Sequence, residues 1–231
     1  DHRDLHSFPT RRSSDLMILD AGCGNGVLTA ILARYGCQTI GMDLSDSVIA
    51  AETHRIELAG PFAPMVHYVQ ANLCEPPFTP SSFDLVYSSG VIHHTPDSHA
   101  AFRALEPLAS PSGTLYIWVY RKRGILFRLW AGHGRMLRRI LPLNALRLYC
   151  SLLAPAYKLV TNMADALGIC SFRKRTSREI ALDIFDCFAP PFNYTHTEAQ
   201  ILEWFASEYQ NTRVSLSQRQ GFGVVGSRRC K

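Results

Sequence analysis

The sequence predicts an α/β fold in which a largely parallel sheet is covered by helices on both faces. Short apolar segments of strand length alternate along residues 17–120 with segments whose apolar residues recur at helical spacing. A glycine-rich stretch, residues 20–26, joins the first of these strands to the first helix, as at the ligand-binding edge of doubly wound folds. A chain of 231 residues with 47% apolar and 19% charged residues is large enough to bury such a core.

The individual elements follow from periodicity and from glycine, proline and capping signals. The apolar runs predict strands at 17–22, 37–43, 65–70, 83–89, 112–120, 212–218 and 222–229. Helical spacing predicts helices at 26–36, 45–60, 97–110 and 195–209, and Gly36 is a suitable stop for the first of them. Strands that alternate with helices indicate right-handed βαβ crossovers.

The charge is divided unevenly along the chain. Residues 17–120 hold three Arg and nine acidic residues, whereas residues 121–185 hold thirteen basic and three acidic ones. The strand–helix rhythm is interrupted over the same basic segment, which predicts a helical insertion at about 121–185 between the fifth and sixth strands. Within it Pro142 and Pro155 are expected to divide the helix into short pieces.

Three roles are open for this basic insertion. Its Arg135, Arg138 and Arg139 can line one helical face, while Met136, Leu137, Ile140 and Leu141 form another. The insertion can be a helical cap with a solvated basic face, an amphipathic helix lying on anionic lipid, or a positive lid for an acidic ligand. Nucleic acid is the weakest candidate, because no nucleic-acid-binding motif accompanies the charge.

Cysteine usage and hydropathy bear on the compartment. The seven cysteines include no C-x-x-C pair, which favours reduced thiols in a cytoplasmic protein over disulfides or a metal site. No run of about 18 uncharged apolar residues predicts a membrane-spanning helix. The expected location is the cytoplasm, with peripheral contact at a membrane as the option that the basic insertion leaves open.

The glycine-rich turn has the chemistry of a particular ligand class. It reads D-x-G-x-G-x-G rather than the G-x-G-x-x-G of dinucleotide folds, and Asp20 at the strand end would repel a phosphate but suit a cationic amino group. Asp43 ends the second strand, where a carboxylate can accept bonds from both ribose hydroxyls. A ligand with a ribose, an amino group and no phosphate is S-adenosylmethionine. The rival interpretations are an ordinary tight turn and a nicotinamide site.

Four motifs in order, ILDAGCGNG, IGMDLS, VQANLCEPPF and FDLVYSSGVIHHTPD, resemble those of class I S-adenosylmethionine-dependent methyltransferases, in the small-molecule group similar to the quinone-biosynthesis enzymes. The match covers roughly residues 17–120 and, more weakly, 186–227. It implies a Rossmann-like three-layer sandwich whose mostly parallel seven-stranded sheet has an antiparallel last strand. The cofactor residues that the turn and the resemblance together indicate are Asp20, Gly22, Cys23, Gly24, Asn25, Gly26, Asp43, Leu44, Asn72, Leu73, Ser89, Gly90 and Val91.

Asn72 departs from the resembling family, which usually has Asp at this position. The Asn72 carbonyl can accept a bond from an adenine amino group but its NH₂ cannot, so weaker adenine selection is expected rather than loss of binding.

The catalytic and substrate candidates cluster near the ends of the fourth and fifth predicted strands. His93 and His94 follow the fourth strand, at the edge where the ligand crevice of such folds lies, and an imidazole with an ordinary pKa near 6.5 takes up a proton near neutral pH. The alternative is that they only order the loop. Tyr120 ends the fifth strand, and Tyr194 and His196 precede the last helix. For these three, substrate contact and loop packing are both open.

The expected function is methyl transfer from S-adenosylmethionine to a small molecule such as a lipid, quinone or glycan precursor. The alternative is a non-catalytic cofactor-binding or membrane-recruited protein. Residues 7–16, SFPTRRSSDL, resemble a translated sequencing adapter, so residues 1–16 are expected to be an artefactual, disordered leader and the methyltransferase domain to comprise 17–231. A helix that usually precedes the first strand would then be missing, leaving a more open cofactor site.

Overall fold

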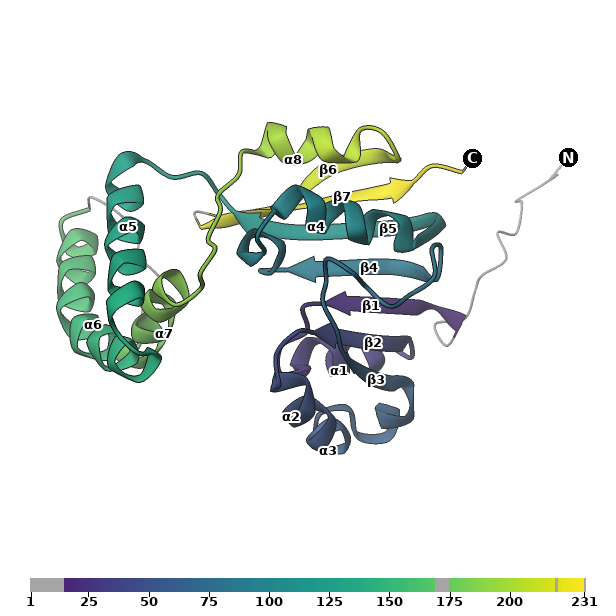
Figure 1. Ribbon diagram of the computed structural model, residues 1–231, viewed down its shortest axis with the longest axis horizontal. Helices are drawn as coiled ribbons and strands as arrows, with labels where there is room; N and C mark the ends of the chain where they lie inside the picture. Colours follow the sequence, from purple (N-terminus) through teal and green to yellow (C-terminus); the bar gives the residue numbers. More distant parts are fainter. Residues whose placement is uncertain (1–14, 169–174, 219, 231) are drawn as a thin grey trace, which may run out of the picture. The chain divides into compact units, whose positions relative to one another are not determined.

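The computed structural model describes residues 15–168, 175–218 and 220–230, and it contains a seven-stranded sheet in the order β3-β2-β1-β4-β5-β7-β6 (Figure 1). Residues 1–14 of the expected leader lie outside the described residues. The strands are β1 (Met17–Ala21), β2 (Gln38–Asp43), β3 (Val66–Gln70), β4 (Phe83–Ser89), β5 (Ala109–Tyr120), β6 (Tyr209–Ser217) and β7 (Gly221–Arg228). All seven predicted strands are therefore present.

The sheet is mixed rather than mostly parallel in its pairing. The pairs β3–β2, β2–β1, β1–β4 and β4–β5 are parallel, whereas β7 runs antiparallel to both of its neighbours, β5 and β6. The β6–β7 pair is antiparallel because only a short connection joins the two strands. Such a connection permits a hairpin, whereas a parallel neighbour needs a crossover of a dozen or more residues.

Helices flank the sheet in two separate groups. The first comprises α1 (Val27–Ala33), α2 (Ser47–Thr53), α3 (Arg55–Ala59) and the 3₁₀ turn η2 (Gly60–Met65). The second comprises η3 (Ile92–His94), α4 (Ser98–Leu105), η4 (Glu106–Leu108) and α8 (Glu198–Phe205). Because strand order runs one way from β1 to β2 and the other way from β4 to β5, right-handed crossovers put α1 and α4 on opposite faces.

The main core lies under α4 and α8. Phe102 and Phe205 are fully buried there with ring centroids 5.1 Å apart, and Tyr209 packs on Phe205 at 5.2 Å. A smaller core of alanines with Val66 lies under α1 and α3.

The prediction of a single helix at 45–60 was wrong, since the chain breaks at His54 into α2 and α3. There the Arg55 guanidinium donates to the Ala63 carbonyl oxygen at 2.6 Å, which holds the second piece to η2.

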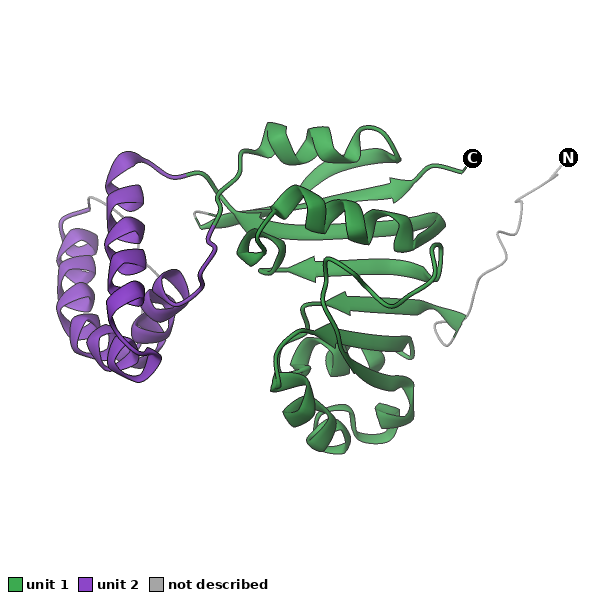
Figure 2. Ribbon diagram, viewed as in Figure 1, with its two compact units in different colours: residues 1–122, 194–231 green, residues 123–193 purple. Residues whose placement is uncertain are grey.

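The chain divides into two compact units: residues 1–122 with 194–231, here called the sheet unit, and residues 123–193 (Figure 2). The second unit, here called the helical unit, contains α5 (Ile125–Ile140), α6 (Leu143–Ala166) and α7 (Ser177–Phe188). Its core is formed by Leu146, Cys150, Ala154, Ile180, Ile184 and Phe188. Over the described ranges, no helix is both long and apolar enough to cross a membrane.

The prediction that both prolines divide the insertion was wrong for Pro155. Pro142 does separate α5 from α6. The 24-residue helix α6, however, continues through Pro155 without a break. An interior proline costs about 3 kcal/mol of helix stability. Burial of the opposite face of α6, at Cys150 and Ala154, against α7 offsets that cost.

The two glycines of α5 provide a matched test of packing in the helical unit. A Cβ on Gly134 would overlap the ring of buried Phe188, whereas a Cβ on Gly132 would meet nothing closer than the Arg135 guanidinium at 3.8 Å. Gly134→Ala should therefore lower the free energy of unfolding by about 1–3 kcal/mol despite the better helix propensity of alanine. Gly132→Ala should raise it by up to about 1 kcal/mol. Urea titration followed by circular dichroism measures both, and equal effects would contradict this packing.

Candidate active site

The predicted cofactor residues lie where the carboxyl ends of β1, β2, β3 and β4 meet. These strands are neighbours in the parallel part of the sheet, so the residues that follow them are brought to one edge (Figure 1). The structure thereby joins segments as far apart in sequence as residues 20 and 91.

The turn after β1 is packed too closely for a side chain at Gly22 and at Gly26. Gly22, Gly24 and Gly26 have φ of 88°, 54° and 73°, in the left-handed region that favours glycine. The Gly22 and Cys23 amides both donate to the Met42 carbonyl oxygen of β2, at 2.6 and 3.0 Å. A Cβ on Gly22 would overlap the side chain of Val91. The first and fourth sequence motifs are therefore in direct contact.

Asp20 lies beneath this turn and is only 2% exposed. Burial raises the pKa of its carboxyl to about 6; the Thr29 hydroxyl, which donates at 2.7 Å, lowers the pKa, and nearby Asp43 raises it. Burial also raises the pKa of the Cys23 thiol to about 12, with Asp20 and Asp43 adding to the shift. Cys23 is thus a protonated packing residue at neutral pH, and the Asp20 carboxyl is buried rather than exposed at the edge.

Asp43 reaches the turn from the end of β2. Its Oδ2 accepts from the Gly24 amide at 2.8 Å, and its Oδ1 accepts from the Ser45 amide and hydroxyl at 2.9 and 2.7 Å. The carboxylate is half-buried, and the neighbouring side chain of Leu44 is 69% exposed. Asn25 is exposed at the outer side of the turn, and its Oδ1 accepts from the Val27 amide at 3.5 Å.

The residues after β3 and β4 complete the edge. The exposed Asn72 accepts from the Cys74 amide through Oδ1 at 3.0 Å, and Leu73 is buried in the main core. After β4, Ser89 is half-buried and the Gly90 amide donates to the Trp118 carbonyl oxygen at 3.1 Å. A Cβ on Gly24 or on Gly90 would meet nothing within 4 Å, so the backbone at both positions borders open space.

The histidine and tyrosine candidates converge beside this edge. The ring of His93 lies 4.2 Å from those of both His94 and Tyr120, centroid to centroid, and the Tyr194 amide donates to the His93 carbonyl oxygen at 2.9 Å. The His196 amide donates to the Tyr120 carbonyl oxygen at 2.9 Å. The structure therefore brings together all five residues that the sequence singled out separately.

His93 differs from the expectation of an ordinary imidazole. It is fully buried, and neither ring nitrogen has a hydrogen-bond partner among the described residues. Burial, with contributions from His94 and His196, lowers its pKa to about 2. His93 is consequently neutral at physiological pH and a poor proton acceptor, because protonation would place an unpaired charge in the core.

His94 and the two tyrosines remain nearer to solvent. His94 is half-buried, and Tyr194 is 43% exposed with its hydroxyl donating to the Pro96 carbonyl oxygen at 3.0 Å. His196 is buried, its Nδ1 lies 3.2 Å from the Gln200 side-chain oxygen, and burial lowers its pKa. Of His93, His94 and His196, only His94 is not buried.

Sequence reasoning missed Tyr68 of β3. Its hydroxyl donates to the Gly26 carbonyl oxygen at 2.9 Å, and its ring fills the space that a Cβ on Gly26 or Gly41 would need. The signal was Gly41 inside a predicted strand, since such a glycine marks a close approach of another group. Tyr68 therefore supports the glycine turn from the side of β3.

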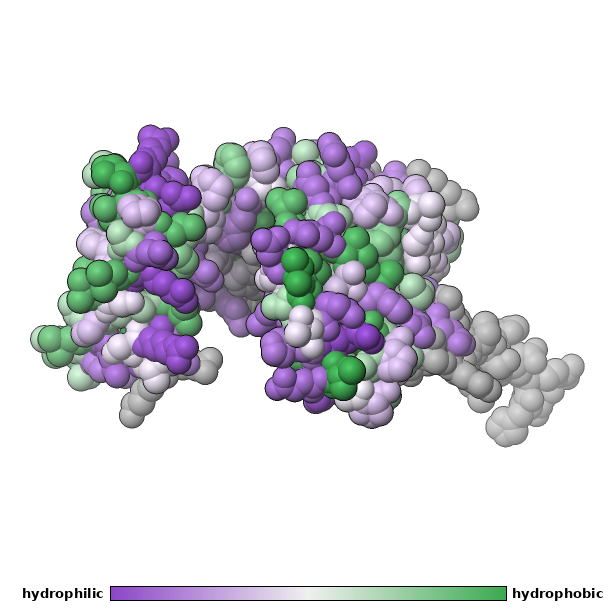
Figure 3. Space-filling model, turned by 60° about the horizontal axis from the view of Figure 1, so that its bottom comes forward, coloured by the Kyte–Doolittle hydropathy of each residue, from purple (hydrophilic) through white to green (hydrophobic). Residues whose placement is uncertain are grey.

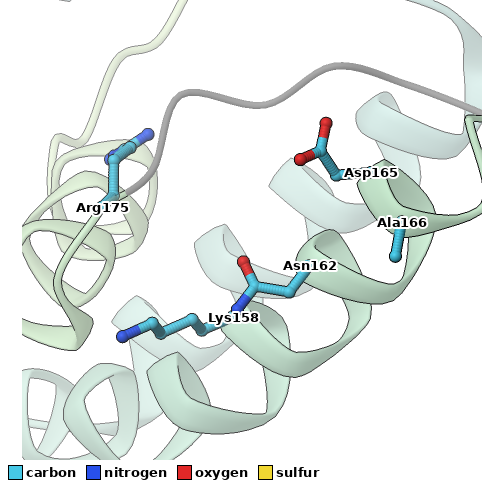
Figure 4. A pocket seen from close by; sticks show the side chains of 5 residues that line it. All are labelled: Lys158, Asn162, Asp165, Ala166 and Arg175. Carbon is cyan, nitrogen blue, oxygen red and sulfur yellow. The ribbon is translucent and has the colours of Figure 1, made fainter.

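A hollow lies on the helical unit. It has a volume of about 330 Å³ and is lined by Lys158, Asn162, Asp165, Ala166 and Arg175 (Figure 4). It contains none of the predicted site residues. Within the described ranges no group of three or more metal-ligating side chains is found.

Comparison with known proteins finds similarity to methyltransferases. Residues 19–117 match the Methyltransferase domain family. A ubiquinone biosynthesis O-methyltransferase from Xanthomonas campestris is 32% identical over 126 residues, which are 54% of this chain and 52% of that protein. An uncharacterized Synechococcus protein is 34% identical over 124 residues, 52% of this chain and 30% of that protein. The chain thus spans about half or less of the curated relatives it matches.

Solved structures show the same fold across nearly the whole chain. A Methanosarcina mazei S-adenosylmethionine-dependent methyltransferase has a TM-score of 0.60 at 18% identity, covering 94% of both chains. Magnesium protoporphyrin IX methyltransferase from Synechocystis has a TM-score of 0.53 at 17% identity, covering 92% of this chain and 70% of that one. This chain has the Rossmann-like fold of class I S-adenosylmethionine-dependent methyltransferases. Its resemblance to the quinone-biosynthesis members of that class is confirmed.

The buried His93 predicts a particular dependence of stability on pH. The unfolded chain protonates this imidazole near pH 6.5 but the folded chain does not, so stability should fall as the pH drops below that value, by up to about 1.4 kcal/mol per pH unit. Asp20 acts in the opposite sense between about pH 6 and pH 4, because its folded-state pKa is raised. His93→Leu keeps Asp20 and His196 and should have a flatter profile in urea titrations from pH 5 to 7. Parallel profiles would contradict a buried neutral His93.

Proposed function

We propose that the protein binds S-adenosylmethionine at the carboxyl edge of β1, β2, β3 and β4 and transfers its methyl group to a small-molecule acceptor. The observation that carries the proposal is the joint placement of Gly24, Asp43 and Gly90. Two positions of bare backbone border open space, and a carboxylate lies between strands β1 and β2 at the same edge. The match of residues 19–117 to methyltransferase domains supports it.

The proposed binding roles follow from the chemistry of the groups present. Asp43 would accept from the ribose hydroxyls, Asn72 would face the adenine with the exposed Leu44 beside it, and Ser89, Gly90 and Val91 would line the methionine end. Asp20 would favour the cationic end through its buried negative charge. Each carboxylate oxygen has two acceptor positions, so the bonds that Asp43 already accepts leave room for hydroxyl donors.

The proposed chemistry divides between the cofactor and the acceptor side. The cofactor supplies a methyl group on a positively charged sulfur, so position and electrostatics are the protein's contribution. An acceptor that must lose a proton needs a base, and His94 is the proposed base. His93 would position His94 and Tyr120 through ring contacts, whereas Tyr194 and His196 would shape the acceptor side.

The acceptor class is proposed from the relatives. Two of the similar proteins are a ubiquinone biosynthesis O-methyltransferase and a magnesium protoporphyrin IX methyltransferase, and both names point to a mostly apolar ring-bearing acceptor. A lipid, quinone or glycan precursor remains the proposed range. The alternative, a cofactor-binding protein without turnover, is separated by measuring S-adenosylhomocysteine release against a panel of such acceptors. Binding of S-adenosylmethionine in calorimetry, without release of S-adenosylhomocysteine on any acceptor, would favour the alternative.

Asp43→Ala should weaken S-adenosylmethionine binding about 10- to 100-fold, because two hydrogen bonds to a carboxylate are lost. Ser45→Ala is the matched control, since it removes the hydroxyl that donates to Asp43 but keeps the carboxylate. Isothermal titration calorimetry of both variants gives the dissociation constants. Unchanged affinity in Asp43→Ala would remove Asp43 from the cofactor site.

His94→Gln should lower kcat by about a hundredfold or more on a hydroxyl acceptor while leaving cofactor affinity within error, as expected for loss of a general base. Tyr120→Phe, which keeps the neighbouring ring, serves as the comparison. Equal kcat in wild type and His94→Gln would show that the acceptor needs no base.

We also propose peripheral contact with a membrane through the basic helical insertion. Residues 125–160 hold six basic and no acidic side chains, which supports attraction to an anionic surface. Co-sedimentation of the intact protein with anionic vesicles tests this contact. Protein that stays in the supernatant would contradict the proposal.

A further inference from the structure

We propose that α5 of the helical unit is an interfacial helix that lies on an anionic lipid bilayer through two parallel stripes, one apolar and one of arginines. This inference specifies the residues behind the membrane contact proposed above, and it is independent of methyl transfer.

The apolar stripe of α5 is left uncovered by its own unit. Ile125, Leu129, Met136 and Ile140 are 62%, 64%, 56% and 69% exposed. Their spacing of four, seven and four residues places them on one side of a helix that turns about 100° per residue. Trp130 and Leu137, in contrast, pack against the core of the helical unit. The helix is therefore apolar on two sides, one buried and one exposed.

The arginine stripe runs beside the apolar one. Arg128, Arg135 and Arg139 are exposed, and each immediately precedes a residue of the apolar stripe. No salt bridge to these three is present in the part of the chain that the structure describes. Arg138, which the sequence grouped with them, is half-buried instead. Hydrophobic and hydrophilic surface accordingly alternate on the face of the helical unit drawn in Figure 3.

This pairing of stripes fits a lipid surface better than a second copy of the chain. Apolar side chains in the acyl boundary and arginines at the level of anionic headgroups are the arrangement of interfacial helices. A symmetric contact between two copies would face arginine against arginine. With no acidic residue from 125 to 160, the surface offers such a copy no compensating charge along α5 or the first three-quarters of α6.

A second apolar stripe on α6 adds exposed surface of the same kind. Leu148, Leu152, Leu159 and Met163 have the same spacing of four, seven and four residues and are 56–71% exposed. Exposed apolar surface of this extent on a folded unit marks an interaction site rather than ordinary solvent contact.

The test uses the full chain and vesicles of phosphatidylcholine with or without about 30% phosphatidylglycerol. Wild-type protein should sediment with the anionic vesicles, bind pure phosphatidylcholine much more weakly, and be released at about 0.5 M NaCl. Arg128→Glu/Arg135→Glu/Arg139→Glu should reduce the partition coefficient about 100-fold or more, because each basic residue near the surface contributes about fivefold. The same three positions changed to Lys should retain binding.

Matched variants distinguish the effect of the two stripes on vesicle binding from the effect of a general change in charge or hydropathy. Leu129→Gln/Met136→Gln/Ile140→Gln should reduce anionic-vesicle binding at least about tenfold. Arg34→Glu/Arg213→Glu/Arg229→Glu makes the same change in net charge on exposed positions of the sheet unit, and Ile49→Gln/Ile56→Gln removes exposed apolar side chains there. Both controls should bind vesicles like wild type, and circular dichroism confirms that each variant is folded.

Three results would overturn the proposal. The first is wild-type protein that does not bind anionic vesicles. The second is equal loss of binding in the α5 variants and in the controls of the sheet unit. The third is concentration-dependent dimerisation, seen by analytical ultracentrifugation and abolished by the apolar α5 variant, which would assign the stripe to a second copy of the chain. Methyl-transfer assays without vesicles report on the proposed reaction separately.

Discussion

The close approach of the turn after β1 to β2 and to the residue after β4 is the constraint on which the site depends. The Gly22 and Cys23 amides share one carbonyl oxygen of β2, and Val91 occupies the space that a side chain at residue 22 would need. Backbone in the left-handed region is tolerated here because the residues are glycines. The same packing leaves the backbone at Gly24 and Gly90 facing open space, so the turn is tight on one side and open on the other.

Burial of polar groups beside that edge has a cost and a use. A neutral imidazole at His93 with unpartnered ring nitrogens and a carboxyl at Asp20 with a raised pKa are both unfavourable for folding near neutral pH. Such groups concentrate at functional sites, where a fixed field or a fixed ring is needed. The two therefore fit a site whose electrostatics are set before a ligand arrives.

The helical unit differs from the sheet unit in the apolar surface that it exposes. Its core is small, and α5 and α6 each keep an apolar stripe exposed on the side away from that core. A soluble helix normally exposes polar side chains there. Arginines beside the apolar stripe of α5, in a segment without acidic residues from 125 to 160, suit an anionic surface, so this unit and the sheet unit have separate proposed tasks.

The sequence by itself determined the strands and the glycine turn, because these depend on local periodicity and on backbone conformations that only glycine adopts readily. It did not determine the break at His54, the continuation of α6 through Pro155 or the support of the turn by Tyr68, since each depends on a contact distant in sequence. Nor could it show that His93 is buried while His94 is half-exposed, because adjacent residues of one type are separated only by what packs around them. Burial sets their electrostatics, and burial is a property of the tertiary structure.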